Sequence, residues 1–148
     1  EYICKRFENT GKHISPELAE EICRLVDNHS SYVQQLSWLL WIRTIKTATT
    51  EQLTYALEDL LDQNNILFQS ETENLSAYQM NFLKAIVDGI HTKFSSKEVI
   101  SKYNLGTSAN IVRLKNALLQ KELIETNGKE IVLADPVFGV WFKKEMLY

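Results

Sequence analysis

The chain has 148 residues, of which 45% are hydrophobic and 24% charged, a balance typical of a folded globular protein with one domain or two small ones. No apolar run reaches the roughly 18 residues of a membrane-spanning helix and no signal peptide opens the chain, so we expect no membrane partner. Its two cysteines lack metal-ligand spacing, which favours reduced thiols and a cytoplasmic location. Because the first residue is Glu1 and not Met, we expect a piece of a longer protein.

Helical periodicity dominates the first half of the chain. A short helix is predicted over residues 1–9, and Ser15 followed by Pro16 begins a second helix, as its cap and its first-turn proline. The segment 32–42 is apolar nearly all round, which predicts the central helix of a bundle. A capping box that opens at Thr49 predicts one further helix with a leucine-rich face.

A polar run over residues 69–74 interrupts this pattern. It predicts a linker between a helical domain, residues 1–68, and a second domain, residues 75–148. The second domain begins with capping boxes at Ser76 and Ser95, each with a Gln or Glu three residues later and flanking apolar residues that can form a staple. Two helices are therefore expected there.

After these helices the period changes. A third helix is predicted over residues 107–121, and short apolar cores predict strands at 122–126 and 130–133. Asn127-Gly128 between them is a hairpin signal that requires positive φ at both positions. Asp135, followed by proline, begins the last helix. The fold class is therefore predicted to be mainly α: a helical bundle followed by a winged helix-turn-helix with a small β-hairpin wing.

The charge of the chain divides along the same boundary. Residues 1–74 hold 6 Lys and Arg against 12 Asp and Glu, whereas residues 75–148 hold 10 against 7. The first half is therefore acidic and the second mildly basic, with net charges of −6 and +3. This asymmetry supports two units.

The motifs of self-contained enzymes are absent from the sequence. It has no GxxxxGK[ST] phosphate loop, no GxSxG nucleophile turn, and no pair of histidines at metal-ligand spacing. We therefore expect no catalytic residue, no metal and no cofactor in this chain, and no enzymatic activity of its own.

The helix 107–121 offers a candidate surface for nucleic acid. Arg, Asn and Gln side chains can pair with base edges in the major groove, and Lys side chains can meet phosphates. The outward-facing or flanking residues of this helix are Asn110, Arg113, Lys115, Asn116 and Gln120, and candidate phosphate contacts are Lys102 and Lys129. A surface helix must be polar in any case, and a net charge of +3 is low for a dedicated DNA-binding domain. A protein-facing role for this helix is therefore the alternative.

The loop 27–32 is the candidate site of the first half. A helix N-terminus exposes free amides and the positive end of the helix dipole, so it can face an anion or a nucleotide. The alternative is structural: Ser30 or Ser31 caps the helix, and Tyr32 packs in the core.

The segment Ile22–Trp41 resembles the lid of AAA+ and STAND-type P-loop ATPases of archaea and bacteria. In that family a loop that usually reads His-Pro-Tyr-Tyr precedes a helix that begins Val-Gln. Here the loop reads His29-Ser30-Ser31-Tyr32, and Val33-Gln34 follow. The second half is similar to the family at Leu75-Ser76 with Gln79, at 103–110, and at Asp135-Pro136-Val137-Phe138 with Trp141.

This resemblance implies an N-terminal P-loop domain, outside the present sequence, that binds ATP and Mg²⁺ and hydrolyses ATP. The helical lid would sense the nucleotide, with His29 and Tyr32 on the adenine side, although Ser30 stands where the family has proline. The implied partners are the P-loop domain, DNA and another protein, the last two through the winged helix. Two alternatives are a stand-alone winged-helix transcription regulator and a protein-interaction scaffold.

Overall fold

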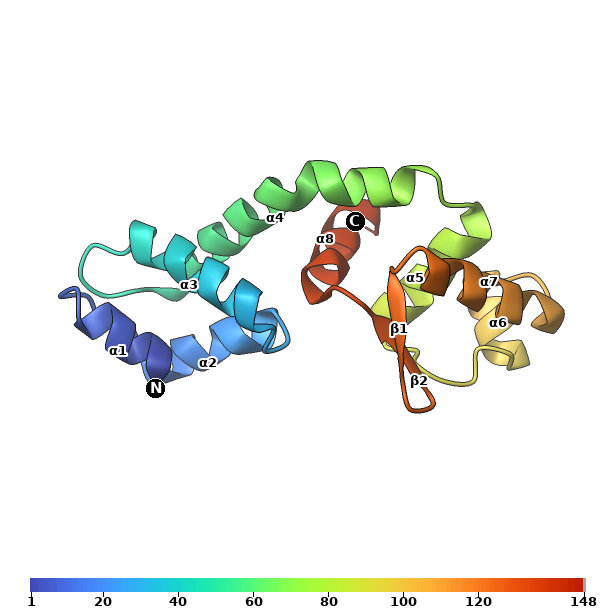
Figure 1. Cartoon of the computed structure of the whole chain (residues 1–148), viewed down its shortest axis with the longest axis horizontal. Coiled ribbons are helices and arrows are strands. Elements are labelled where there is room, and N and C mark those ends of the chain that lie inside the picture. Colours follow the sequence, from blue (N-terminus) through green and yellow to red (C-terminus); the bar gives the residue numbers. More distant parts are fainter. Residues whose placement is uncertain (148) are drawn as a thin grey trace. The chain divides into compact units, whose positions relative to one another are not determined.

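The computed structural model describes residues 1–147 and is mainly helical, with eight helices and one two-stranded sheet in that range (Figure 1). It divides into two compact units, Glu1–Asn65 and Ile66–Tyr148, here called the helical unit and the winged unit. The helical unit holds α1 (Tyr2–Glu8), α2 (Pro16–Leu25), α3 (Ser30–Arg43) and the larger part of α4 (Thr50–Glu73).

Local signals in the sequence begin the helices of the helical unit where they were predicted. The hydroxyl of Ser15 accepts a hydrogen bond from the backbone N–H of Leu18 at 3.1 Å, one turn into α2. Thr49 and Gln52 form both bonds of the capping box at the start of α4, at 3.0 and 3.2 Å. The Ser15 cap and the Thr49 box both supply partners for backbone donors that a helix N-terminus leaves unpaired.

The helix α3 is less central than its composition predicted. Leu36, Leu39 and Leu40 are buried, but the side chains of Trp38 and Ile42 are 58% and 51% exposed. The expectation of a helix buried all round is therefore wrong. The three leucines fill the core from one side of α3, and Trp38 and Ile42 lie on the exposed side.

Residues 69–73 are helical, so the predicted linker is wrong as local structure. The helix α4 continues to Glu73 because Phe68, 1% exposed, packs against Phe138 and Trp141 with ring centroids 5.4 and 5.6 Å apart. One turn later the buried Thr72 donates its hydroxyl to the carbonyls of residues 68 and 69. Between these anchors Gln69 and Ser70 are exposed and Glu71 is half-buried, and the division between the units falls inside α4.

The winged unit has the predicted order of elements. Besides the end of α4, it holds α5 (Ala77–Val87), α6 (Lys97–Tyr103), α7 (Ser108–Gln120), β1 (Ile124–Asn127), β2 (Glu130–Leu133) and α8 (Pro136–Met146). Three helices, an antiparallel hairpin and a closing helix make a winged helix, as the sequence predicted (Figure 1). Its core includes Phe82 of α5, stacked on Phe94 with ring centroids 4.5 Å apart.

The turns and caps of this unit depart from prediction by one residue at two places. Asn127 pairs with Glu130, so the two loop residues of the hairpin are Gly128 and Lys129, and of the predicted pair only Gly128 has a positive φ, +64°. The cap of α6 is Ser96, whose hydroxyl accepts from the N–H of Val99 at 3.3 Å, and not Ser95. The caps of α5 and α8, Ser76 and Asp135, are as predicted.

Candidate functional site

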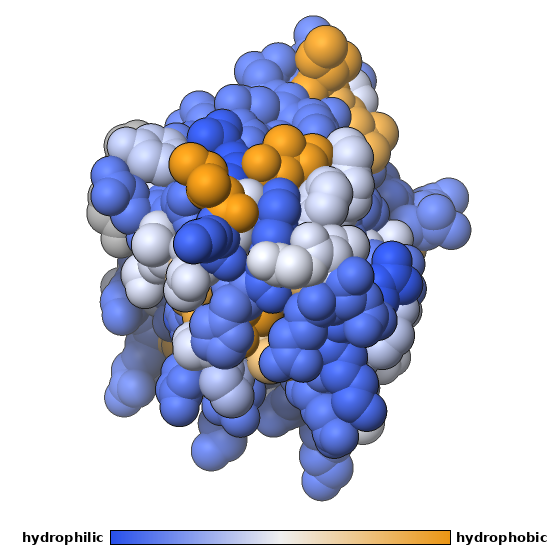
Figure 2. Space-filling model, turned by 90° about the vertical axis from the view of Figure 1, so that its left-hand side faces the viewer, coloured by the Kyte–Doolittle hydropathy of each residue, from blue (hydrophilic) through white to orange (hydrophobic). Residues whose placement is uncertain are grey.

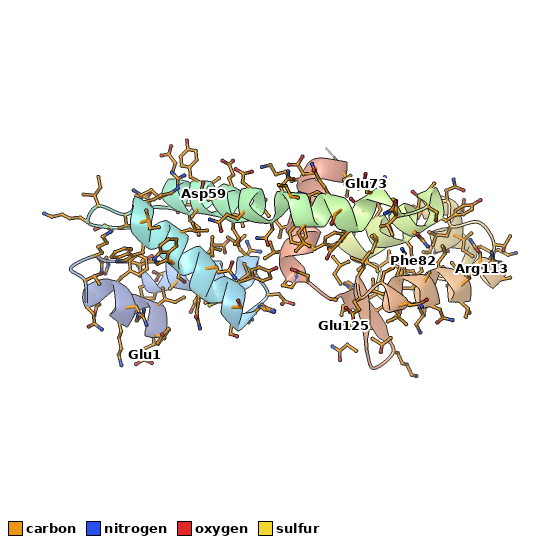
Figure 3. The ribbon with its side chains drawn as sticks, turned by 45° about the horizontal axis from the view of Figure 1, so that its top comes forward. Glu1, Asp59, Glu73, Phe82, Arg113 and Glu125 are labelled. Carbon is orange, nitrogen blue, oxygen red and sulfur yellow. The ribbon has the colours of Figure 1, made fainter. Side chains whose placement is uncertain are left out.

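The helix α7 presents the predicted face to solvent. Ile111, Leu114 and Leu118 are buried on its inner side. On the opposite side Arg113, Asn116 and Gln120 are exposed, and Lys115 is half-buried. Figure 3 labels Arg113 near the outer edge of the winged unit, away from Glu125 on the wing. One exposed residue of this face, Val112, was not predicted as part of it, and its side chain is 63% exposed.

The turn between α6 and α7 fixes the start of the candidate recognition helix. Asn104 closes α6 in the left-handed region with φ +53°, Leu105 is fully buried, and Gly106 has φ +87°. The side-chain amide of Asn110 donates to the carbonyl of Leu105 at 3.2 Å. One N–H of the Asn110 amide is therefore engaged in the turn, which holds this side chain toward the loop before α7.

The candidate phosphate contacts come from two other elements. Lys102 lies on α6 with its ammonium 5.3 Å from the ring centroid of Tyr103, and Lys129 lies in the hairpin loop. Both are exposed, and within residues 1–147 neither forms an ion pair, nor does Arg113. Glu125 and Glu130 stand on the strands next to this loop, so the wing itself repels phosphate.

The candidate nucleotide-facing loop begins with two consecutive residues of positive φ, Asp27 at +50° and Asn28 at +57°. His29 then takes the cap position of α3 but forms no cap bond with its side chain. Its ring lies 4.9 Å from that of Tyr32, centroid to centroid. The structure therefore brings the two predicted residues together at the start of α3.

The alternative in which a serine caps α3 is wrong. Ser30 and Ser31 are the first two residues of the helix, and the hydroxyl of Ser31 accepts from the side-chain amide of Gln35 at 3.1 Å. Since no side chain caps α3, its first amides keep their capacity to face an anion. Tyr32 is half-buried, not a core residue.

A groove between α1 and α3 was not predicted. It is lined by aromatic residues of both helices, among them Tyr2, Phe7, Trp38 and Trp41. On the side of the molecule that carries the helical unit, apolar residues gather in patches on a mainly hydrophilic surface (Figure 2). Trp38 and Trp41 are at helical spacing in the sequence, but only tertiary packing places them opposite Tyr2 and Phe7.

No group of three or more metal-ligating side chains gathers anywhere in the described part of the chain. Within the same part, no helix combines the length and the apolar character needed to cross a membrane.

The family described as "Probable winged helix domain" matches residues 66–144, more than half of the chain. The chain belongs to this family. The matched segment begins where the winged unit begins, inside α4 and not at the predicted boundary of 75. The family thus includes the last turns of α4 in the winged helix domain. A search of curated proteins finds no match to the chain.

Among solved structures, the Walker-type ATPase PABY2304 of Pyrococcus abyssi is similar to the chain. The TM-score is 0.67 and the sequence identity 20%, over 96% of this chain and 40% of that chain. At this identity the likeness shows the fold alone. The fold of both the helical unit and the winged helix domain therefore occurs in part of a Walker-type ATPase, and the chain spans well under half of that protein's length.

Proposed function

We propose that this chain is the C-terminal regulatory region of a larger AAA+ or STAND-type P-loop ATPase. The helical unit serves as the lid over the nucleotide, and the winged helix domain binds DNA or a protein partner. One observation carries the proposal: the likeness to a Walker-type ATPase extends over 96% of this chain, which includes the helical unit and not only the winged helix. A stand-alone winged-helix regulator gives no reason for that extent.

In this proposal the chain itself performs no chemistry. ATP and Mg²⁺ bind to the P-loop domain, whereas the lid contributes the rings of His29 and Tyr32 and the free amides at the start of α3. The adjacent rings can lie against a purine, and the uncapped amides favour an anionic group. The consecutive positive φ angles of Asp27 and Asn28 support a fixed loop at this position.

The first test is to determine the coding sequence upstream of Glu1. The proposal expects an open frame that contains a GxxxxGK[ST] loop between a strand and a helix. An initiator codon immediately upstream would contradict the ATPase and leave a stand-alone winged-helix regulator, since no room for a P-loop domain would exist.

The DNA-binding role rests on the exposed face of α7, where Arg113 and Asn116 can each make two hydrogen bonds to a base. Anisotropy of a labelled duplex should show binding that weakens as salt is added. Arg113→Ala should weaken it about tenfold, the lower half of the range for one bidentate contact. Lys102→Ala should instead reduce the salt dependence by about one unit of slope. The matched control is Arg24→Ala, an exposed arginine of the helical unit.

If the anisotropy of the labelled duplex does not change at low salt, the winged helix domain does not bind DNA, and a protein partner is favoured. One observation supports that second candidate: Val112 is exposed beside Arg113 and Asn116 on α7, and the buried core of a protein interface is richer in apolar residues than the rest of the surface. In that case Val112→Asp should abolish capture of the protein partner by the full-length ATPase, and Arg113→Ala should weaken that capture.

A further inference from the structure

The groove between α1 and α3 has a volume of about 600 Å³ and lies wholly within the helical unit. Its apolar lining consists of Tyr2, Ile3, Phe7, Val33, Trp38 and Trp41. This volume is within the range of roughly 300–1,000 Å³ that is usual for small-molecule sites. Tyr2 and Trp38 are more than half exposed, so the aromatic wall is accessible from solvent.

The wall is held in place by contacts between α3 and the turn that follows α1. The indole N–H of Trp41 donates to the hydroxyl of Thr10 at 2.8 Å. The ammonium of Lys12 donates to the carbonyl of Trp41 at 2.8 Å and lies 3.9 Å from the centroid of its ring. A ring fixed from two sides loses little conformational entropy on binding, so the groove is organised before a ligand arrives.

Ser37 places an unpaired hydroxyl in the lining of this groove. Its Oγ is the one buried side-chain polar atom without a hydrogen-bond partner in the part of the chain that the structure describes. An unpaired buried hydroxyl destabilises the chain because it has lost its hydrogen bonds to water. Because this oxygen is buried in the unliganded chain, it can pair with a ligand only when the Ser37 side chain rotates toward the groove, and the gain of a partner favours that rotation.

Arg6 contributes a positive charge that no carboxylate of residues 1–147 neutralises. Its Nη1 donates to the hydroxyl of Tyr2 at 3.0 Å, and the guanidinium lies 5.7 Å from the centroid of the Tyr2 ring. Both contacts are with a neutral group, and the ion pairs of the described chain do not include Arg6. No Asp or Glu lines the groove, so its charge complement is an anion.

We propose that the α1–α3 groove binds a small amphipathic anion: a molecule with a ring-containing apolar body and one carboxylate-like group. The body lies against Trp38 and Trp41, and the anionic group pairs with Arg6. The hydroxyl of Ser37 turns toward the groove and pairs with a polar atom of the ligand. Guanidinium–carboxylate pairs are among the strongest hydrogen bonds, and an aromatic wall beside them selects for rings.

The length of the groove favours a small molecule over a docked helix. Its lining on α3 extends from Val33 to Trp41, about 12 Å at the rise of an α-helix. The mean helix of three turns is about 16 Å long and would overrun it.

The test uses two dyes of similar shape, anilinonaphthalene sulfonate and its uncharged analogue phenylnaphthylamine, with the whole chain. Fluorescence titration should show that the wild-type chain prefers the sulfonate. Arg6→Gln should lower the affinity for the sulfonate about tenfold and leave the neutral dye unaffected, because one charge-assisted hydrogen bond is lost. Ser37→Leu fills the groove and should weaken both dyes.

The matched control is Lys5→Gln, which removes the same charge one residue away on α1 from a side chain that does not line the groove. It should leave both affinities unchanged. An equal effect of Lys5→Gln and Arg6→Gln would overturn the proposal, because the preference would then reflect net charge alone. So would binding that neither Arg6→Gln nor Ser37→Leu changes, or capture of an acidic amphipathic peptide by a chain that binds neither dye.

Discussion

Gly106 occupies the most constrained backbone position in the turn before α7. Its φ is +87°, and a Cβ built there would lie 3.2 Å from the amide nitrogen of Asn110 and 3.5 Å from the ring of Tyr78. Gly128 in the hairpin also has a positive φ, +64°, but nothing lies within 4 Å of its Cβ position. The two glycines therefore share the backbone requirement, and only Gly106 adds close packing.

We expect Gly106→Ala to lower the free energy of unfolding by about 2 kcal/mol and Gly128→Ala by about 1 kcal/mol. The difference arises because alanine at 106 displaces the Asn110 amide, which donates to the carbonyl of Leu105. Urea unfolding of both variants measures it. Equal losses would mean that the contacts around Gly106 contribute nothing beyond its φ angle.

Glu71 is a half-buried carboxyl on α4. Burial raises its pKa, and the negative charge of Asp135 raises it further. A pKa that is higher in the folded than in the unfolded chain means that ionisation opposes folding. The stabilising contribution is therefore complete below the unfolded pKa of the carboxyl and is lost as pH rises through the folded pKa.

Glu71→Gln should consequently raise Tm at pH 7, by about 1–2 °C given its partial exposure. The gain should disappear at a pH below the ordinary pKa of glutamate, where Glu71 is protonated in both states. Glu73→Gln is the control, since Glu73 ends the same helix and is exposed. If both variants melt alike at every pH, charge at the helix end and not burial explains the effect.

At the scale of elements, most helix starts could be predicted because their signals are local. The side-chain bonds of Ser15, Ser76 and Asp135 lie within three residues of the cap, so the sequence alone contains them. At α6 two serines stand side by side, and the identity of the cap depends on how the preceding turn enters the helix. The groove between α1 and α3 had no local signal, since the packing of two helices about 30 residues apart creates it.

The cap of α6 can be tested with two neighbouring substitutions of the same kind. Ser96→Ala should lower the free energy of unfolding by about 1 kcal/mol, because it removes the acceptor for the N–H of Val99. Ser95→Ala should have little effect, since Ser95 is exposed and outside the helix. Thermal melts of the two variants compare them directly, and a larger loss for Ser95→Ala would restore the box predicted from sequence.

At the scale of the whole molecule, the polar run 69–74 misled prediction because composition reports solvent exposure and not the absence of a helix. Within residues 68–74 only Phe68 and Thr72 are buried, and two residues one turn apart are too few to show a periodic pattern. The aromatic partners of Phe68, Phe138 and Trp141, are about 70 residues away in sequence. The end of α4 is therefore a part of the winged helix core that only the tertiary structure defines.

This assignment predicts where the chain can be divided. A fragment of residues 66–148 keeps Phe68 on the aromatic cluster of α8 and should unfold cooperatively. A fragment of residues 75–148 exposes Phe138 and Trp141. It should be less stable by about 3–5 kcal/mol, the cost of a buried Phe→Ala change. Phe68→Ala in the longer fragment should reproduce most of that loss without any change of length. Trp141 fluorescence during urea unfolding follows all three, because Trp141 is the one tryptophan of either fragment. Equal urea midpoints for the two fragments would contradict this assignment and support the predicted domain boundary at residue 75.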